Sequence, residues 1–382
     1  RGERMMPGKL LTIGSALLIT MLPLCCAAES LDDTTSYEIT IHADNHRVAD
    51  VTVSLVPTDP VFYMFPGANQ LPKRWATFVS DFEIRDEDGR KLRVAARDNG
   101  TWQLFRMPQG RVTLSYRITL DHEQYEWSGG VDGAAYWRKW GVFYTARSLF
   151  VVNGDGREDI AIQVRLPDEW RITAPWQPTN EEATHFLVRD HDALAASMLF
   201  AGTHKEVAVR RGPFEFLLAL GGREVLELED ELITMAEGVL DYYVNLVGDV
   251  PRLGSQSASG NPVVIINQAD MTDGEAIGDN ISMLLGSEGG PMSQHIARLI
   301  FAHEFFHLWN GKSFAPSAED GEWFKEGFSN YYTLKALHHI GYLTDDSFLG
   351  LLSDLFYQRY VQDEAVGRQS MTNGNLKHDH WG

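Results

Sequence analysis

The stretch His303-Glu304-Phe305-Phe306-His307 places two histidines four residues apart, with a glutamate directly after the first. Apolar residues at helical spacing predict a helix over residues 291–307, with a proline in its first turn. Residues four apart lie on one face of a helix, so both imidazoles can bind the same ion. Two histidines and a glutamate buried without such a partner would be costly. The stretch therefore predicts a metal site in a helical part of the chain.

Glu326 is the expected third ligand. It follows near the start of a second expected helix, over residues 322–339. Two histidines and one glutamate leave a fourth position open for water, as in catalytic zinc sites. We therefore expect one Zn²⁺ per chain, with other divalent metals as the alternative. A set of hydrogen-bonded core histidines with a paired glutamate is the non-metal alternative.

Two more residues receive roles from their spacing. Glu304 lies beside the ion without having to bind it, which suits a general base that takes a proton from the attacking water. Asn330, four residues after Glu326, could hydrogen-bond the outer nitrogen of a ligating histidine. An ordinary amide on the helix surface is the alternative for Asn330.

Two longer blocks carry a resemblance to a known family. HEFFHLWN at residues 303–310 and WFKEGFSNYY at residues 323–332 are similar to blocks of the M61 glycyl aminopeptidase family of metallopeptidases. The resemblance implies a thermolysin-like (gluzincin) catalytic domain behind an N-terminal β domain. It also implies an aminopeptidase that favours small N-terminal residues such as Gly or Ala. By matching position, His303, His307 and Glu326 would be the zinc ligands and Glu304 the base.

The sequence departs from the family pattern in three places. Ahead of the first block, Glu275 is the candidate to bind a substrate amine, and a solvated loop acid is the alternative. Lys325 replaces a small residue of the second block, and we expect it to point outward. Family members also continue further, so we expect a catalytic domain that is incomplete at its C-terminus. Among the tyrosines available as oxyanion donor, Tyr357 and Tyr360 are the candidates.

The distribution of patterns along the chain predicts an α+β protein. Short alternating runs, such as residues 37–41, 51–55 and 111–118, predict strands from about residue 37 to 209. Such strands favour an antiparallel β-sandwich-like domain over residues 29–210. From residue 211 to 382 helical spacing dominates, beginning with an expected helix at 226–246, and this part would be the metallopeptidase domain.

Residues 1–28 have the layout of a secretory signal peptide: Arg4 and Lys9, then an apolar run, then small residues. The expected location is therefore periplasmic or extracellular, with no membrane span after removal of the signal. An uncleaved anchor and a lipoprotein anchor at Cys25 are the alternatives. Both cysteines of the sequence, Cys25 and Cys26, lie in this segment, so the mature chain would contain no thiolate site.

The formal charge of −20 argues against nucleic acid as a partner, because phosphate binding needs basic patches. The expected partner is a peptide or protein substrate. Two other functions stay open. One is a zinc endopeptidase that needs no free N-terminus, and the other is a truncated, non-catalytic metal-binding or scaffold protein.

Overall fold

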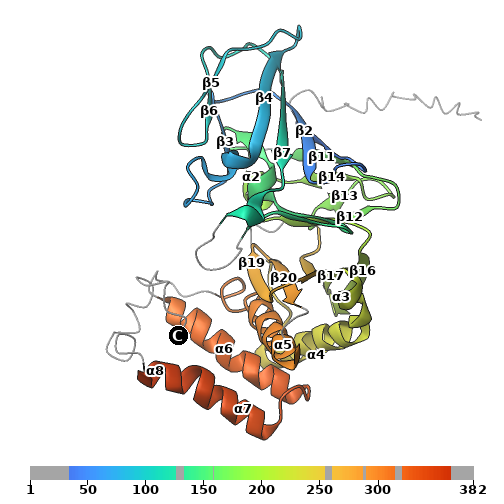
Figure 1. Ribbon diagram of the computed structural model, residues 1–382, viewed down its shortest axis with the longest axis vertical. Coiled ribbons are helices and arrows are strands. Elements are labelled where there is room, and N and C mark those ends of the chain that lie inside the picture. Colours follow the sequence, from blue (N-terminus) through green and yellow to red (C-terminus); the bar gives the residue numbers. More distant parts are fainter. Residues whose placement is uncertain are drawn as a thin grey trace, which may run out of the picture. The chain divides into compact units, whose positions relative to one another are not determined.

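The computed structural model describes residues 34–125, 133–157, 159–253, 260–286, 290–314 and 321–362. The expected signal peptide and both cysteines lie outside the described residues. In the described part of the chain, sheets come first and helices follow (Figure 1). The α+β class expected from the sequence is therefore confirmed.

A seven-stranded sheet forms the largest layer of the first part. Its strand order is β13-β14-β11-β1-β2-β7-β4. The strands are β1 (Thr35–Ile41), β2 (Val48–Leu55), β4 (Val79–Asp86), β7 (Val112–Thr119), β11 (Ile160–Arg165), β13 (Gln177–Pro178) and β14 (His185–Val188). Alternate residues of β1 and β7 are buried, as the period-two pattern predicted. One pair, β1 and β11, is parallel, which alternation cannot reveal because it does not encode strand direction.

Two four-stranded antiparallel sheets complete the first part. Their orders are β10-β3-β6-β5 and β12-β15-β9-β8. The first comprises β3 (Val61–Met64), β5 (Val94–Ala96), β6 (Trp102–Leu104) and β10 (Val151–Asn153), and the second β8 (Tyr136–Arg138), β9 (Gly141–Thr145), β12 (Arg171–Thr173) and β15 (Met198–Gly202). Along the chain, the strands of this part are interrupted by short helical segments: η1 (Arg74–Phe78), η2 (His122–Gln124), α1 (Ala146–Leu149) and α2 (His191–Ala195).

A five-stranded mixed sheet opens the second part. Its order is β16-β17-β18-β20-β19, with β16 (Lys205–Arg211), β17 (Phe214–Gly221), β18 (Val263–Ala269), β19 (Asp273–Ile277) and β20 (Asn280–Gly286). β16 pairs antiparallel with β17, so the expected domain boundary between residues 210 and 211 falls inside this hairpin. β19 was not expected as a strand, because its sequence Asp-Gly-Glu-Ala-Ile contains residues typical of a turn.

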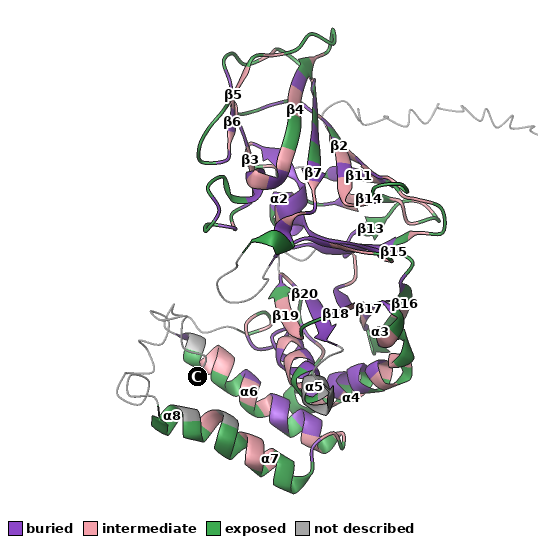
Figure 2. Cartoon of the chain, viewed as in Figure 1, coloured by how far each residue is buried: buried purple, intermediate pink, exposed green. Residues whose placement is uncertain are grey.

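Both faces of the inner strands β18 and β20 are buried, which explains their nearly continuous apolar sequences. In β18, Val264 and Ile266 face a core shared with the helices, and Val263 and Ile265 face a core shared with β9 and β15. Figure 2 shows β18 buried and buried stretches along α4. A strand buried on both sides loses the polar alternation of a half-exposed one.

The helices of the second part follow the sheet. They are α3 (Arg223–Glu227), α4 (Glu229–Val247), α5 (Gly290–Phe306), α6 (Glu322–His339), α7 (Asp345–Leu351), the π-helical segment η4 (Leu352–Tyr357) and α8 (Gln358–Gln362). α4 ends at Gly248, whose φ of 86° is the left-handed conformation common after a helix. The three long helices confirm the expectations for residues 226–246, 291–307 and 322–339. In the described ranges, no helix combines the length and the apolar character needed to cross a membrane.

Candidate metal centre

α5 places the two expected histidines on one face, one turn apart. His303 and His307 are only 8% and 7% exposed, and their Nε2 atoms lie 3.1 Å from each other. The two rings stand nearly perpendicular, at 89°. Phe301 and Phe305 stack on the other side of the helix and anchor it in the core. The apolar residues of α5 thus fix the direction in which both imidazoles point.

Glu326 reaches the same point from α6. Its Oε2 lies 3.0 Å from Nε2 of His303 and 3.6 Å from Nε2 of His307. Zinc bonds of about 2.0–2.1 Å in a tetrahedral site place neighbouring ligand atoms roughly 3.3 Å apart. The three donor atoms therefore have the spacing and the chemistry of a His₂Glu zinc set. The structure brings all three expected ligands together.

Glu304 lies on the same turn of α5 as the histidines. Three potential ligand atoms, one each from His303, Glu304 and His307, lie within 4.8 Å of one another. Burial raises the pKa of the Glu304 carboxyl above its ordinary value, an effect that the neighbouring histidines oppose. A carboxylate with a raised pKa accepts a proton more readily than a solvated one. The position and the environment of Glu304 both suit a general base.

The outer nitrogen of His307 has two partners, and neither is Asn330. Nδ1 of His307 lies 3.0 Å from the backbone carbonyl of Asn310 and 3.3 Å from the hydroxyl of Ser329. Because a carbonyl can only accept, Nδ1 carries the proton and donates it, which leaves the Nε2 lone pair for a metal. At His307, the contact that the sequence suggested for Asn330 at one of the ligating histidines is therefore made by Asn310 and Ser329. Ser329, one residue earlier on α6, is completely buried, whereas Asn330 is partly exposed.

Asn310 also ties the two helices together. It is fully buried, and its side-chain amide donates to the backbone carbonyl of Lys325 over 2.9 Å. Neither Asn310 nor Ser329 was identified from the sequence. The sequence did contain a pattern that points to them, because both lie inside the two blocks that carry the family resemblance. Nothing in the spacing, however, shows that a backbone carbonyl three residues after a histidine faces its ring.

Lys325 does not point outward, so that expectation is wrong. Its ammonium lies 3.0 Å from Oε1 of Glu326. Burial would raise the pKa of Glu326, but the nearby His303 and His307 side chains and the charge of Lys325 hold it well below its ordinary value. Glu326 is therefore a carboxylate at neutral pH, as a metal ligand must be.

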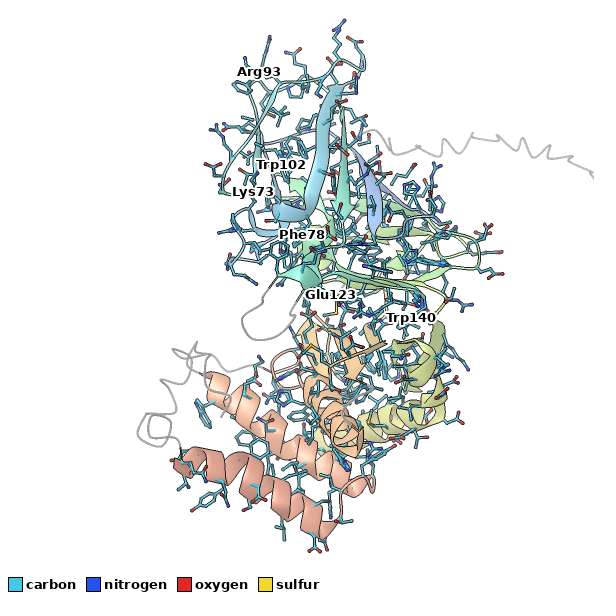
Figure 3. All side chains as sticks on the ribbon, in the orientation of Figure 1. Lys73, Phe78, Arg93, Trp102, Glu123 and Trp140 are labelled. Carbon is cyan, nitrogen blue, oxygen red and sulfur yellow. The ribbon has the colours of Figure 1, made fainter. Side chains whose placement is uncertain are left out.

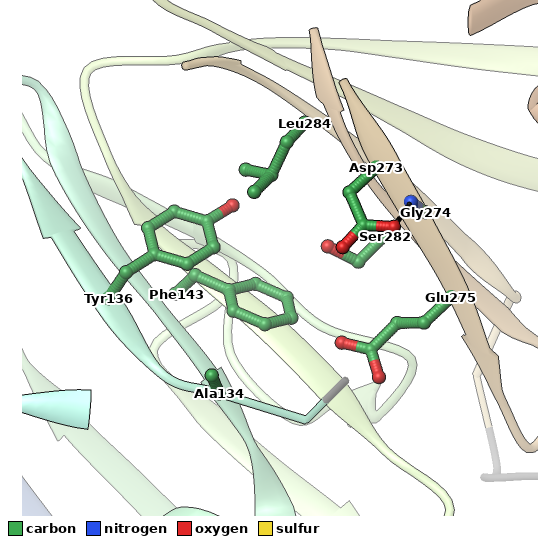
Figure 4. Close-up of a pocket in the computed structure, with 8 residues that line it drawn as sticks. All are labelled: Ala134, Tyr136, Phe143, Asp273, Gly274, Glu275, Ser282 and Leu284. Carbon is green, nitrogen blue, oxygen red and sulfur yellow. Dashed lines mark hydrogen bonds between the residues drawn. The ribbon is translucent and has the colours of Figure 1, made fainter. Parts of the chain in front are cut away.

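Glu275 lies on the edge strand β19 and is no solvated loop acid. Its Oε2 accepts a hydrogen bond of 2.5 Å from the backbone N–H of Gly133. Figure 4 shows Glu275 beside a small pocket. The pocket is lined by Ala134, Tyr136, Phe143, Asp273, Gly274, Glu275, Ser282 and Leu284. The proposed contact of Glu275 with a substrate amine stays a prediction.

The two tyrosine candidates lie far along the chain in η4 and α8. Tyr357 is 65% exposed and Tyr360 is 53% exposed. An oxyanion donor must point into a site from which water is largely excluded. The structure therefore assigns this role to neither tyrosine.

Known proteins share this architecture. The structure resembles the crystal structure of an aminopeptidase N family protein from Idiomarina loihiensis, with a TM-score of 0.69 and 19% sequence identity. The match covers 89% of this chain and 60% of that chain, so this chain spans less than two thirds of its neighbour's length. At this identity the likeness concerns the fold. A comparison with curated protein sequences gave no match.

Family models identify the chain more closely. Residues 36–203 match the peptidase M61 N-terminal domain, and residues 297–381 match the M61 glycyl aminopeptidase model. The second match includes all three candidate ligands and Glu304. The chain belongs to the M61 peptidase family.

Proposed function

We propose that this protein is a zinc-dependent aminopeptidase that releases small N-terminal residues such as Gly or Ala from peptides. The observation that carries the proposal is the convergence of His303 Nε2, His307 Nε2 and Glu326 Oε2 within 3.0–3.6 Å of one another. These three donors would hold the ion. Zinc bound in such a site supplies Lewis-acid polarisation of a carbonyl and acidification of water.

Glu304 performs the proton transfers in this proposal. Its carboxylate takes a proton from the attacking water as the water oxygen bonds to the peptide carbonyl carbon. The same group then gives that proton to the departing amine as the C–N bond breaks. A raised pKa suits both steps, because the residue must accept the proton and release it again in one turnover.

The pocket beside β19 supports an aminopeptidase over an endopeptidase. Asp273 and Glu275 are two residues apart on one strand, so both carboxylates lie on one face and both line the pocket. Two carboxylates favour a cationic group such as a free N-terminal ammonium. The pocket is small, which favours a small first residue.

β19 also lies along the helix that carries the histidines. Gly274 is so close to α5 that a Cβ at this position would lie 2.3 Å from Cγ2 of Ile300. Ile300 precedes His303 by about one turn. This packing places β19 beside α5, while Asp273 and Glu275 alternate with Gly274 and lie on the other face of the strand.

The proposed substrate is a peptide with a free N-terminus, and the proposed location is outside the cytoplasm, after removal of residues 1–28. Both proposals come from the sequence, together with the acidic pocket for the substrate. Neither nucleic acid nor a membrane surface is part of the proposed function.

The test pairs metal content with hydrolysis. The protein from Glu29 onward and its Glu304→Gln variant are analysed for zinc by mass spectrometry and assayed with Gly- and Ala-arylamides and with N-blocked peptides. We expect one zinc per chain in both proteins, and a loss of activity of about 10²–10⁴-fold in the variant.

The other results each point to a different function. Cleavage of blocked peptides alone would identify an endopeptidase. Bound zinc without any hydrolysis would favour the non-catalytic metal-binding protein. Absence of zinc even after metal is added back would show that the ligand assignment is wrong.

A further inference from the structure

We infer that Lys325 is a positioning residue for Glu326, whose Oε1 it holds so that Oε2 is presented to the metal. This inference rests on the proposed function, because it concerns the same metal site.

The two oxygens of Glu326 face different partners. Oε1 lies 3.0 Å from the ammonium of Lys325, and Oε2 lies 3.0 Å and 3.6 Å from the two imidazole nitrogens. A carboxylate can bind zinc through one oxygen or through both. With Oε1 engaged by the ammonium, single-oxygen binding through Oε2 is favoured, which keeps the fourth position of the ion open.

Lys325 is itself held at two further points. Its backbone carbonyl accepts from the buried amide of Asn310 over 2.9 Å. Its aliphatic stem passes Gly311, where a Cβ would lie 3.3 Å from Cε of Lys325. Gly311 has a φ of 123°, so the close turn and the space for the stem both favour glycine. The side chain is 32% exposed, which is low for a lysine.

A positioning role and a purely electrostatic effect of Lys325 predict opposite changes in zinc affinity when its side chain is removed. A lysine ammonium close to the site repels a divalent cation, so its removal alone would strengthen zinc binding. If Lys325 instead orients Glu326, its removal frees the carboxylate to rotate and weakens binding. Loss of a group that orients a metal ligand typically costs about 10–100-fold in metal affinity.

The test compares Lys325→Met with Lys325→Arg, which keeps the positive charge. Lys335→Met is the matched control, because Lys335 is an exposed lysine on the same helix. Zinc affinity is measured by competition with a chelator, and the zinc coordination number by X-ray absorption. Far-UV circular dichroism checks that each variant is folded.

We expect Lys325→Met to bind zinc about 10–100-fold more weakly and with a higher coordination number. Lys325→Arg should recover most of the affinity, and Lys335→Met should match the parent protein. Equal or tighter zinc binding by a folded Lys325→Met would overturn the inference and leave the proposed function intact. If Lys325→Met does not fold, failure of Lys325→Arg to bind zinc like the parent would overturn it. No zinc in the parent protein would overturn the proposed function and this inference together.

Discussion

Asn310 connects the two helices of the metal centre through two different groups. Its backbone carbonyl accepts from Nδ1 of His307, and its side-chain amide donates to the carbonyl of Lys325. The first contact orients a ligand on α5, and the second fixes the start of α6 one residue before Glu326. A substitution of the side chain therefore removes the second contact and leaves the first in place.

We predict that Asn310→Ala destabilises the protein and weakens zinc binding. Removal of a buried hydrogen-bonding group typically costs about 1–3 kcal/mol of the free energy of unfolding. Zinc affinity should fall because Glu326 is no longer held in place relative to the histidines. Denaturant unfolding and chelator competition measure the two effects.

Asn330→Ala provides the comparison, because Asn330 is a partly exposed asparagine on α6. It should change zinc affinity less than Asn310→Ala does. A larger effect at Asn330 than at Asn310 would return the orienting role to the residue expected from the sequence.

At the scale of elements, the contact between β19 and α5 positions the acidic pocket. β19 pairs antiparallel with β20 at the edge of the sheet and packs along the helix of the histidines. Gly274 permits this approach, since any side chain there meets Ile300. The strand therefore needs a glycine at position 274 because of close packing, and not because of its backbone conformation, since the φ of Gly274 lies outside the left-handed region.

We predict that Gly274→Ala lowers kcat/KM for Gly-arylamides. The added methyl would lie 2.3 Å from Cγ2 of Ile300, so the strand or the side chain must move. A displacement of about 1 Å near a reacting group can cost up to about 100-fold in rate. Steady-state kinetics of the purified variant measure this effect.

Two further variants test whether the loss of activity in Gly274→Ala comes from the contact with Ile300. Gly274→Ala combined with Ile300→Ala should recover part of the activity relative to Gly274→Ala, because the double substitution restores space. Gly350→Ala on α7, where nothing lies near the added Cβ, should keep full activity. No rescue in the double variant would argue that the spacing between β19 and α5 is unimportant.

At the scale of the whole described molecule, each part has its own apolar core, and a smaller apolar cluster joins the two. Phe143, Met198 and Phe200 of the first part pack in one cluster with Val263 and Ile265 of the second. The indole N–H of Trp140, which is labelled in Figure 3, donates to Asn267 over 3.0 Å. Asn267 in turn donates to the hydroxyl of Tyr136 over 3.1 Å. Apolar packing and a buried polar chain thus join the sheets on both sides.

We predict that Phe200→Ala destabilises both parts together. Phe200 is fully buried in the cluster that joins the two parts, and removal of such a ring typically costs about 3–5 kcal/mol. Differential scanning calorimetry should show one transition that moves to lower temperature. Phe105→Ala, which truncates a ring that is 60% exposed, should change stability by about 1 kcal/mol at most. Two separate transitions, with only one moved, would show that the parts unfold independently.

The local sequence was enough to predict the α+β class, the three long helices and the convergence of His303, His307 and Glu326 with Glu304 beside them. The helices and the placing of His303, Glu304 and His307 follow from helical periodicity, which acts within one or two turns, whereas Glu326 lies on a second helix and was expected also from the blocks that resemble the M61 family. Tertiary contacts alone decided the rest. Lys325 turns toward Glu326, Asn310 and Ser329 contact His307, and Asp273–Ile277 forms an edge strand against α5. Each of these depends on segments that meet only after folding, and the preference of a single residue carries no information about such a neighbour.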